Sequence, residues 1–211
     1  AWPGAISLVR AMPTAGLVLI TLGGLWLCLW RRPWRLAGIV PMVAGGLSVL
    51  AAPPPDILVS GDAKLFAVRT AEGELLLSTG KARRFDAEVW RRRAGETDAD
   101  TWPHSGEAAN GRLRCDPLGC IYRTEGQVVA LVQDSRALDD DCAAATVVIS
   151  REPIGRHACA TANVRIDRFD LWREGGHAVW LSESGVRVET VAGQRGQRPW
   201  TEDRRQNAED R

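Results

Sequence analysis

Two long apolar segments open the chain. Residues 11–30 (AMPTAGLVLITLGGLWLCLW) and 36–55 (LAGIVPMVAGGLSVLAAPPP) contain no charged side chain. A helix of about 20 apolar residues spans the hydrocarbon core of a bilayer, whereas a helix this long in a soluble protein normally shows a polar stripe. The pattern therefore predicts two transmembrane helices, over about 11–30 and 36–53, rather than a pair of buried helices. Gly23-Gly24 and Gly45-Gly46 would let such helices pack closely.

The segment between them, RRPWR at residues 31–35, is predicted to be a tight turn. Pro33 is expected to stop the first helix, and Trp26, Trp30 and Trp34 are expected to form an interfacial aromatic belt. Arginines in short loops mark the cytoplasmic side of a membrane. We therefore expect the inner (plasma) membrane location of a multi-pass protein, with residues 56–211 outside the cytoplasm, periplasmic or extracellular.

Charge divides the chain into two blocks. Four of its 27 basic residues and none of its 26 acidic residues lie in residues 1–55, so residues 56–211 have a net charge of 23 − 26 = −3. We expect a soluble domain over 56–192, after the stiff Pro53-Pro54-Pro55 spacer, and a disordered polar tail over 193–211. Because the chain begins with Ala1 and has no pattern of a signal peptide, we expect it to be a piece of a longer polypeptide.

Strand-like patterns dominate the soluble block. One helix is expected over 81–95 with Phe85 and Val89 on its apolar face, and another over 136–144, capped by Ser135. Residues 96–111 read as a polar loop. The expected strands are 57–70, 74–79, two short runs around Cys115 and Cys120, 127–133, 145–150, 163–167, 177–182 and 186–191. The fold class is therefore α/β or α+β, with few helices.

Four cysteines lie in the soluble block, and Cys28 lies in the first apolar segment. An even number of cysteines outside the cytoplasm favours disulfides. From local spacing we favour Cys115–Cys120 and Cys142–Cys159. The alternatives are a four-cysteine zinc site, which the separation of 17 residues in the second pair disfavours, and free buried cysteines.

Several stretches together resemble the C-terminal part of the ComEC competence family, most closely its alphaproteobacterial branch. They are GGLWLCLWRRPWRLAGIVP, PPPDILVSGDAKLFAVR, RCDPLGC, IDRFDLWREGGHAVWL and RPW, and they extend over nearly the whole chain. The resemblance implies the end of a polytopic membrane domain followed by a metallo-β-lactamase-like domain outside the cytoplasm. It further implies an inner-membrane channel that takes up single-stranded DNA in natural transformation.

The catalytic motifs of that family are incomplete here. Family members regarded as nucleases carry a motif resembling D-V-G-Q-G-D, a dense H-x-H-x-D-H cluster, and a later Asp and His. The stretch LVSGDA keeps Gly61 and Asp62 of the first motif, and Asp134 lies where the later Asp would be. A dinuclear metal site needs closely spaced imidazoles and carboxylates, but His104, His157 and His177 are far apart in sequence. We therefore expect a degenerate, catalytically inert domain with no catalytic residues, metal or cofactor.

A basic segment remains as a candidate contact surface. Arg83, Arg84, Trp90, Arg91, Arg92 and Arg93 lie on or near the first expected helix. A solvated helix face is the simpler interpretation of such a charge run, and the net charge of −3 disfavours a broad nucleic-acid surface. The alternative is a patch that contacts DNA or an assembly partner.

Three functional hypotheses follow. The domain has a structural or DNA-guiding role in the uptake channel, whose partners are single-stranded DNA and membrane lipid. Alternatively, it is a metal-dependent nuclease that degrades the non-transported strand. The third hypothesis is a scaffold that binds other competence proteins or stabilises a homodimer of the channel.

Overall fold

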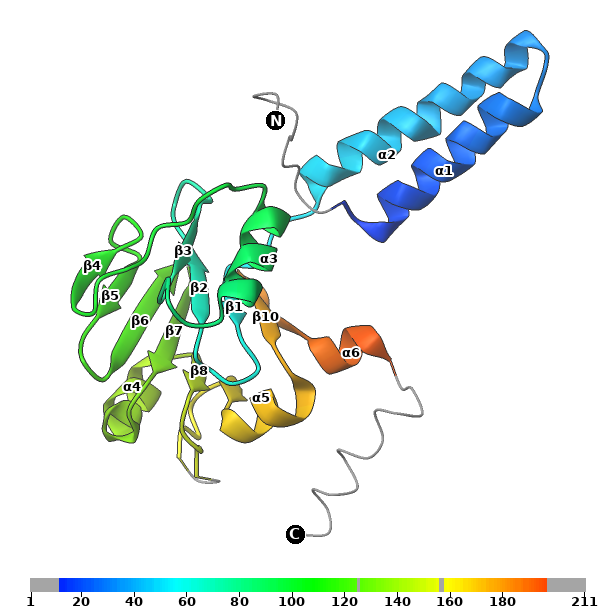
Figure 1. The fold of residues 1–211 in the computed structure, drawn as a ribbon. Coiled ribbons are helices and arrows are strands. Elements are labelled where there is room, and N and C mark those ends of the chain that lie inside the picture. The colour runs from blue at the N-terminus through cyan, green and yellow to red at the C-terminus, as the bar shows by residue number, and fades with distance from the viewer. Residues whose placement is uncertain (1–11, 125, 156–157, 197–211) are drawn as a thin grey trace. The chain divides into compact units, whose positions relative to one another are not determined.

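The computed structural model describes residues 12–124, 126–155 and 158–196, and these form two compact units (Figure 1). One unit comprises the described residues up to Pro54 together with Trp90–Thr97. The other comprises Pro55–Val89 and the described residues from Asp98 onward. The division after Pro54 falls beside the expected boundary at residue 55, whereas the inclusion of Trp90–Thr97 in the first unit was not expected from the sequence.

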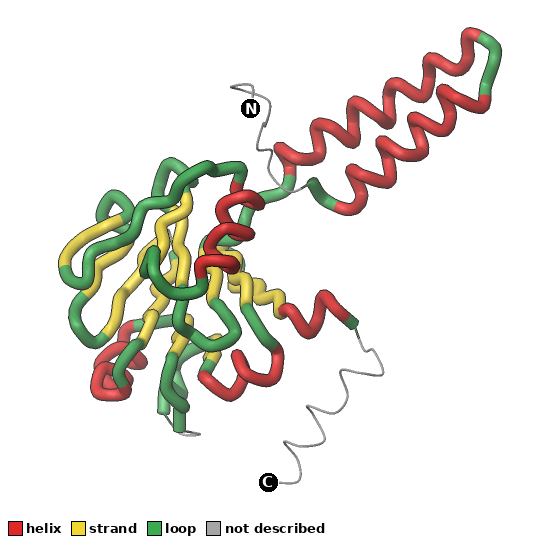
Figure 2. The backbone as a smooth tube through the Cα atoms, in the orientation of Figure 1, coloured by secondary structure: helices red, strands yellow, loops and turns green. Residues whose placement is uncertain are grey.

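The first unit is mainly helical, whereas the second contains runs of two to four strands separated by short helices (Figure 2). The elements are α1 (Thr14–Leu29), a 3₁₀ helix η1 (Pro33–Gly38), α2 (Ile39–Ala51), β1 (Ile57–Val59), β2 (Phe66–Arg69), β3 (Leu75–Leu77), α3 (Arg84–Ala94), β4 (Gly106–Ala108), β5 (Leu113–Cys115), β6 (Gly119–Thr124), β7 (Gln127–Val132), η2 (Ser135–Ala137), α4 (Leu138–Ala144), β8 (Val147–Ser150), β9 (Val164–Ile166), α5 (Arg168–Glu174), β10 (His177–Ser182), β11 (Gly185–Thr190) and α6 (Val191–Arg195).

The first unit is an antiparallel helical hairpin built on glycines. A Cβ atom on Gly23 would lie 2.5 Å from the carbonyl oxygen of Gly38, and one on Gly45 would lie 2.6 Å from that of Gly16. The two backbones therefore approach too closely for any larger residue at these points. Gly24 and Gly46, the second members of the two glycine pairs, have no such neighbour within 4 Å.

The hairpin corrects the prediction of two membrane-spanning helices. Among the described residues, one helix is long and apolar enough to cross a membrane, the 19-residue stretch Pro33–Ala51. The other apolar helix, Thr14–Leu29, has 16 residues. The prediction overestimated this helix because apolar composition continues beyond the residues that keep helical geometry: Trp30 is already extended, with ψ of 134°.

The turn between these helices also differs from the prediction. Pro33 does not stop the first helix; it occupies the first turn of η1, a position that suits its fixed φ and missing N–H. The connecting residues are Trp30–Arg32. The predicted tryptophan cluster is present, since the ring of Trp26 lies 5.1 Å from that of Trp30 and 5.8 Å from that of Trp34.

The second unit contains two sheets that pack face to face. The first sheet is antiparallel, in the order β11-β10-β1-β2-β3. The second has the order β4-β5-β6-β7-β8-β9 and becomes parallel from β7 onward. One core joins them, because Ile57 and Val68 of the first sheet share it with Tyr122, Leu131 and Ile149 of the second. This confirms the predicted mixed α/β class.

A helical layer covers the outer face of the second sheet. Val129 and Leu131 of β7 face the core between the sheets, whereas Ala130 and Val132 pack with Leu138 of α4. Both faces of β7 are therefore buried, which explains its continuous apolar sequence QVVALV. The parallel pairing of β7 with β8 follows from the α4 crossover between them.

Several local predictions were wrong. The expected strand 57–70 is two strands, β1 and β2, separated by a turn. Phe85 was expected on the apolar face of its helix but is 79% exposed, and Ala87 is the buried residue of α3. The loop 96–111 contains β4, and α6 extends to Arg195 in the segment expected to be disordered. The rest of that segment, residues 197–211, lies outside the described residues.

The helix α5 was not predicted from the sequence. α5 follows β9 directly, and Asp167 accepts hydrogen bonds from the N–H groups of Phe169 and Asp170. The side chain of Asp170 accepts one in return from the N–H of Asp167, at 3.1 Å. This capping box is visible in the sequence as D-R-F-D, where its first Asp is also the last residue of the strand-like pattern NVRID.

Candidate functional site

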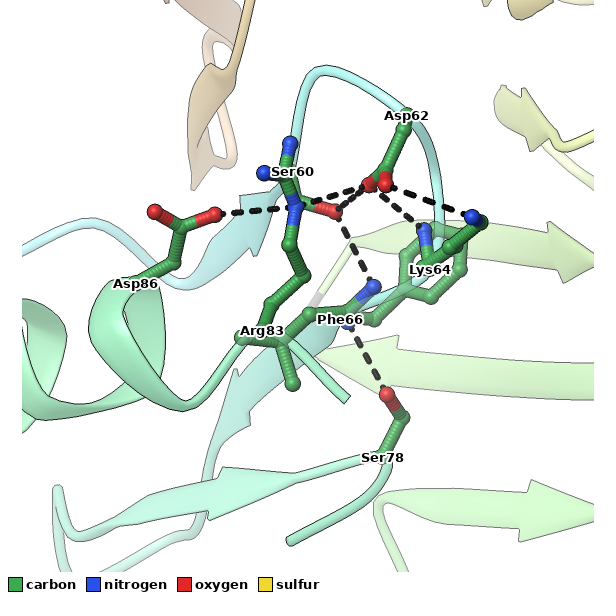
Figure 3. Close-up of polar contacts among 8 residues, drawn as sticks. Ser60, Asp62, Lys64, Phe66, Ser78, Arg83 and Asp86 are labelled. Carbon is green, nitrogen blue, oxygen red and sulfur yellow. Dashed lines mark hydrogen bonds and ion pairs between the residues drawn. The ribbon is translucent and has the colours of Figure 1, made fainter. Parts of the chain in front are cut away.

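The loop after β1 holds the two motif residues Gly61 and Asp62. Ser60, which is buried, organises this loop: its hydroxyl donates to Oδ1 of Asp62 at 2.8 Å and accepts from the N–H of Leu65 at 3.0 Å (Figure 3). The N–H of Lys64 also donates to Oδ1 of Asp62, at 3.2 Å. The carboxylate of Asp62 is thus an acceptor that closes its own turn.

A close backbone approach favours glycine at position 61. A Cβ atom at this position would lie 3.2 Å from the Cα atom of Gly175 and 3.3 Å from the nitrogen of Gly176. These two glycines directly precede β10, the neighbour of β1 in the sheet. Gly61 therefore has a packing role that needs no bound ligand to explain it.

Two cations lie beside the carboxylate of Asp62. Nε of Arg83 lies 3.2 Å from Oδ1 of Asp62 and 3.2 Å from Oδ2 of Asp86, so its guanidinium bridges the two acids (Figure 3). Nζ of Lys64 is more distant, 3.9 Å from Oδ2 of Asp62. Partial burial would by itself raise the pKa of Asp62, but the hydrogen bonds from Ser60 and Lys64 and the charge of Arg83 outweigh it and lower that pKa.

Asp134 has a local structural role. Its side chain caps η2 by accepting from the N–H of Arg136, which corrects the prediction that Ser135 is the cap. Its carboxylate also forms a two-point ion pair with the guanidinium of Arg136, with contacts of 3.1 Å and 2.8 Å. The side-chain and backbone hydrogen bonds from Arg136 lower the pKa of Asp134 to about 2.

The histidines are dispersed. His177 is buried in β10 and its Nδ1 lies 2.9 Å from the carbonyl oxygen of Gly175. His104 is exposed, and His157 lies outside the described residues. Within the described part of the chain, no three His, Cys, Asp or Glu side chains come together in an arrangement that could hold a metal ion.

The predicted basic segment is not one uniform surface. Arg83 precedes α3 and forms ion pairs with Asp62 and Asp86. Arg84 begins the helix and is exposed. Trp90 and Arg91 are half-buried, whereas Arg92 and Arg93 are exposed. Trp90 and the three arginines after it belong to the hairpin unit, and Arg83 and Arg84 belong to the other.

Both favoured cysteine pairs form disulfides in the structure. Cys115 and Cys120 face each other across the β5–β6 hairpin. Cys142 of α4 is bonded to Cys159, in the loop that follows β8. Cys28 is free and exposed. The second disulfide therefore anchors the helical layer to the connection between β8 and β9.

A cleft of about 380 Å³ opens beside the Asp62 loop. Its position follows from the sheet, because Gln133 and Arg151 come directly after the carboxyl ends of the parallel strands β7 and β8. Ligands of α/β proteins bind at such strand ends. The residues that line it are Ala63, Lys64, Phe66, Ser78, Thr79, Trp102, His104, Ser105, Asp116, Pro117, Cys120, Gln133 and Arg151.

None of the polar residues in this cleft was identified as a site residue from the sequence. They come from six separate stretches of chain, and no motif joins them. The feature that could have located the cleft is the parallel pairing of β7 and β8, the strands that end before Gln133 and Arg151. This pairing becomes apparent only when the order of the strands is known.

No protein-family model matches this chain, and neither does any curated protein or solved structure.

Proposed function

We propose that this chain is the C-terminal part of a ComEC-like DNA uptake channel. It would contribute a membrane-embedded helical hairpin and a degenerate metallo-β-lactamase-like domain outside the cytoplasm. The domain would be catalytically inert and would guide the DNA strand or support the channel. The proposal depends on the resemblance in sequence together with the three structural features that follow.

The exposed apolar surface of the hairpin supports the proposed location in a membrane. Large apolar side chains point outward along both helices, including Leu22 at 60% exposure, Val40 at 72% and Leu50 at 82%. Water would make so much exposed apolar area unfavourable, whereas lipid would not. A 16-residue α1 is about 24 Å long, shorter than a hydrocarbon core of about 30 Å, so the proposed crossing is made by Pro33–Ala51 and α1 packs against it.

The disulfides support an external location for the domain. Disulfides persist in oxidising compartments and are rare in the cytosol, and this domain has two. Arg31 and Arg32 in the turn of the hairpin and Arg35 in η1 would then lie on the cytoplasmic side, in agreement with the positive-inside rule. The disulfides and the arginines thus each favour the same orientation.

The arrangement of the domain supports a degenerate metallo-β-lactamase-like fold. Two facing sheets, a helical layer outside one of them and a Gly-Asp loop directly after the first strand are compatible with such a fold. The inert character rests on Asp62 and Asp134, because each carboxylate already binds an arginine, Arg83 and Arg136 respectively. A metal ion would have to displace these partners.

The orientation can be tested by cysteine labelling in intact cells. In a Cys28→Ala background of the full-length protein, we would introduce Glu183→Cys in the β10–β11 turn or Arg32→Cys in the hairpin turn. A membrane-impermeant maleimide should label the Glu183→Cys variant in intact cells. It should label the Arg32→Cys variant only after permeabilisation. The reverse pattern would contradict the proposed topology.

The channel function can be tested by transformation. Deleting residues 56–211 from the full-length protein in a naturally transformable host should reduce transformation frequency. Unchanged uptake would show that the domain is dispensable. Loss of the channel complex in membrane crosslinking would indicate a scaffold, whereas an intact complex with lost uptake would indicate DNA guiding.

The inert character needs its own assay. The purified chain should neither retain stoichiometric zinc or manganese nor cleave single- or double-stranded DNA when these metals are added. Metal-dependent cleavage that persists after repurification would replace the inert domain with the nuclease alternative.

A further inference from the structure

The cleft between the Asp62 loop and the ends of β7 and β8 has the chemistry of an anion site. Two cationic side chains line it, those of Lys64 and Arg151. Both residues are exposed, so their charged ends can reach a ligand that enters from solvent. They come from different parts of the chain and converge only because the loop after β1 lies beside the end of β8.

Arg151 is the stronger of the two ligand-binding candidates. Its backbone N–H donates to the carbonyl oxygen of Val132 at 3.0 Å, which fixes the residue at the strand end. Its guanidinium forms no ion pair or hydrogen bond with any residue in the described part of the chain. Five donor N–H groups in a planar fork are thereby available, and this geometry matches phosphate.

The ammonium group of Lys64 keeps most of its capacity to donate hydrogen bonds. The 3.9 Å distance from its Nζ to Oδ2 of Asp62 is a long contact, and Arg83 lies closer to the same carboxylate, at 3.2 Å. An ammonium group has three donors. Lys64 can therefore turn at least two of them toward a ligand without leaving Asp62 unpaired.

Further polar side chains complete the lining. The hydroxyl oxygen of Ser78 accepts from the N–H of Phe66 at 2.9 Å, and that of Thr79 accepts from the N–H of Lys81 at 3.2 Å. Their hydroxyl protons remain available for donation. Gln133 adds an amide and His104 an imidazole at the exposed rim.

One carboxylate, that of Asp116, lines the cleft among the described residues. Its Oδ1 accepts from the N–H groups of Leu118 and Gly119, at 2.8 Å and 2.9 Å, so part of its charge is already stabilised by the turn. The formal balance of Lys64, Arg151 and Asp116 is therefore +1, which favours an anion.

The floor of the cleft is apolar. Phe66, Trp102, Ala63 and Cys120 are all less than one-tenth exposed and line it from below. Its volume of about 380 Å³ lies at the small end of ligand sites. It suits one phosphate with one sugar and base, whereas a longer segment of a nucleic acid strand would have to extend into solvent.

We propose that this cleft binds the phosphate group of a single nucleotide, with the guanidinium of Arg151 and the ammonium of Lys64 as its charged contacts and the apolar floor beneath the sugar or base. The nucleotide is either a free nucleoside monophosphate or the phosphorylated end of a DNA strand, since both present the same group. The contacts named are protein groups, and no cluster of metal-ligating side chains lies among the described residues of the cleft. The inference is independent of the membrane topology and of the channel function proposed above.

Calorimetric titration of the full 211-residue chain in detergent, with EDTA present throughout, tests the proposal. We expect saturable binding of dAMP, weaker binding of inorganic phosphate and no binding of deoxyadenosine. The Arg151→Gln variant should lose about 10- to 100-fold in affinity, the size expected for a charge-assisted hydrogen-bond pair. The Lys64→Gln variant should lose less, because an ammonium makes a single point contact.

Two further variants separate this cleft from its surroundings. The Asp116→Asn variant keeps the acceptor for the turn and removes the negative charge, so it should bind dAMP more tightly. The Arg168→Gln variant removes an exposed arginine at the start of α5, outside the cleft, and should bind as the unmodified chain does. Circular dichroism would confirm that each variant is folded.

Oligonucleotides with and without a 5′ phosphate identify the source of the ligand. Preference for the phosphorylated oligonucleotide indicates a DNA end, whereas binding of dAMP alone indicates a free nucleotide, and either result supports the site. The proposal would be overturned by absent dAMP binding at millimolar concentration, or by equal losses in the Arg168→Gln and Arg151→Gln variants. It would equally fail if Arg123→Gln, in the neighbouring hollow, abolished binding while Arg151→Gln did not.

Discussion

The hydroxyl of Ser60 donates a 2.8 Å hydrogen bond to the carboxylate of Asp62 while accepting one from the N–H of Leu65. Ser60 and Asp62 thus close the turn between β1 and β2 together, and the N–H of Leu65, a fully buried residue, depends on this hydroxyl. The loop that carries the motif residues is held by its own hydrogen bonds, which accounts for its order without a metal.

Replacing Ser60 by Ala should lower the free energy of unfolding of the domain by about 1–3 kcal/mol, because the N–H of Leu65 would be left buried without its acceptor. Urea unfolding followed by near-ultraviolet circular dichroism would measure the loss. The matched control is Ser105→Ala, at the exposed rim of the cleft, where we expect a change within about 0.5 kcal/mol. Equal effects of the two substitutions would argue against the role assigned to Ser60.

Asp62 should also make stability depend on pH. Its pKa in the folded protein is lowered, so its ionised form contributes stability above the unfolded pKa of about 3.9. That contribution is lost as the pH falls through the lower folded-state pKa. Unfolding free energies measured from about pH 5 down to pH 2 should therefore fall less steeply in the Asp62→Asn variant. Parallel curves for the two proteins would show that Asp62 does not contribute.

The hairpin offers a test that compares adjacent residues. Gly23→Val should destabilise the packing of α1 against α2 by about 1–3 kcal/mol, because its side chain would enter the backbone of Gly38. Gly24→Val should be tolerated, since no neighbour lies within 4 Å of that position. The midpoint of thermal unfolding in detergent would distinguish the variants. A similar loss in both would indicate an effect of helix propensity instead of packing.

The two disulfides should differ in their contributions. Loss of Cys142–Cys159, which closes a separation of 17 residues, should cost about 3 kcal/mol of unfolding free energy on the chain-entropy estimate. Loss of Cys115–Cys120, with a separation of 5 residues, should cost about 2 kcal/mol. Double alanine variants of each pair, compared in urea unfolding, would measure both. A larger cost for the shorter loop would mean that native-state contacts dominate.

The sequence by itself was sufficient to predict those elements that depend on short-range patterns. Apolar composition located the hairpin, and residue spacing favoured the two cysteine pairs that the structure contains. The alternating pattern HAVWLS gave β10 with its bounds. Each of these features depends on neighbours within about twenty positions, so the information lies within one stretch of chain.

Only the tertiary structure decided the features that join distant segments. The ion pair between Asp62 and Arg83 links residues 21 positions apart, and the cleft joins Lys64 to Arg151. The exposure of Phe85 was likewise decided by the tertiary structure. Periodicity identifies an apolar position on a helix, but it does not show whether another element covers that position. The physical reason is that strand order and sheet packing bring these groups together, and both result from the burial of apolar area over the whole domain, which no local pattern encodes.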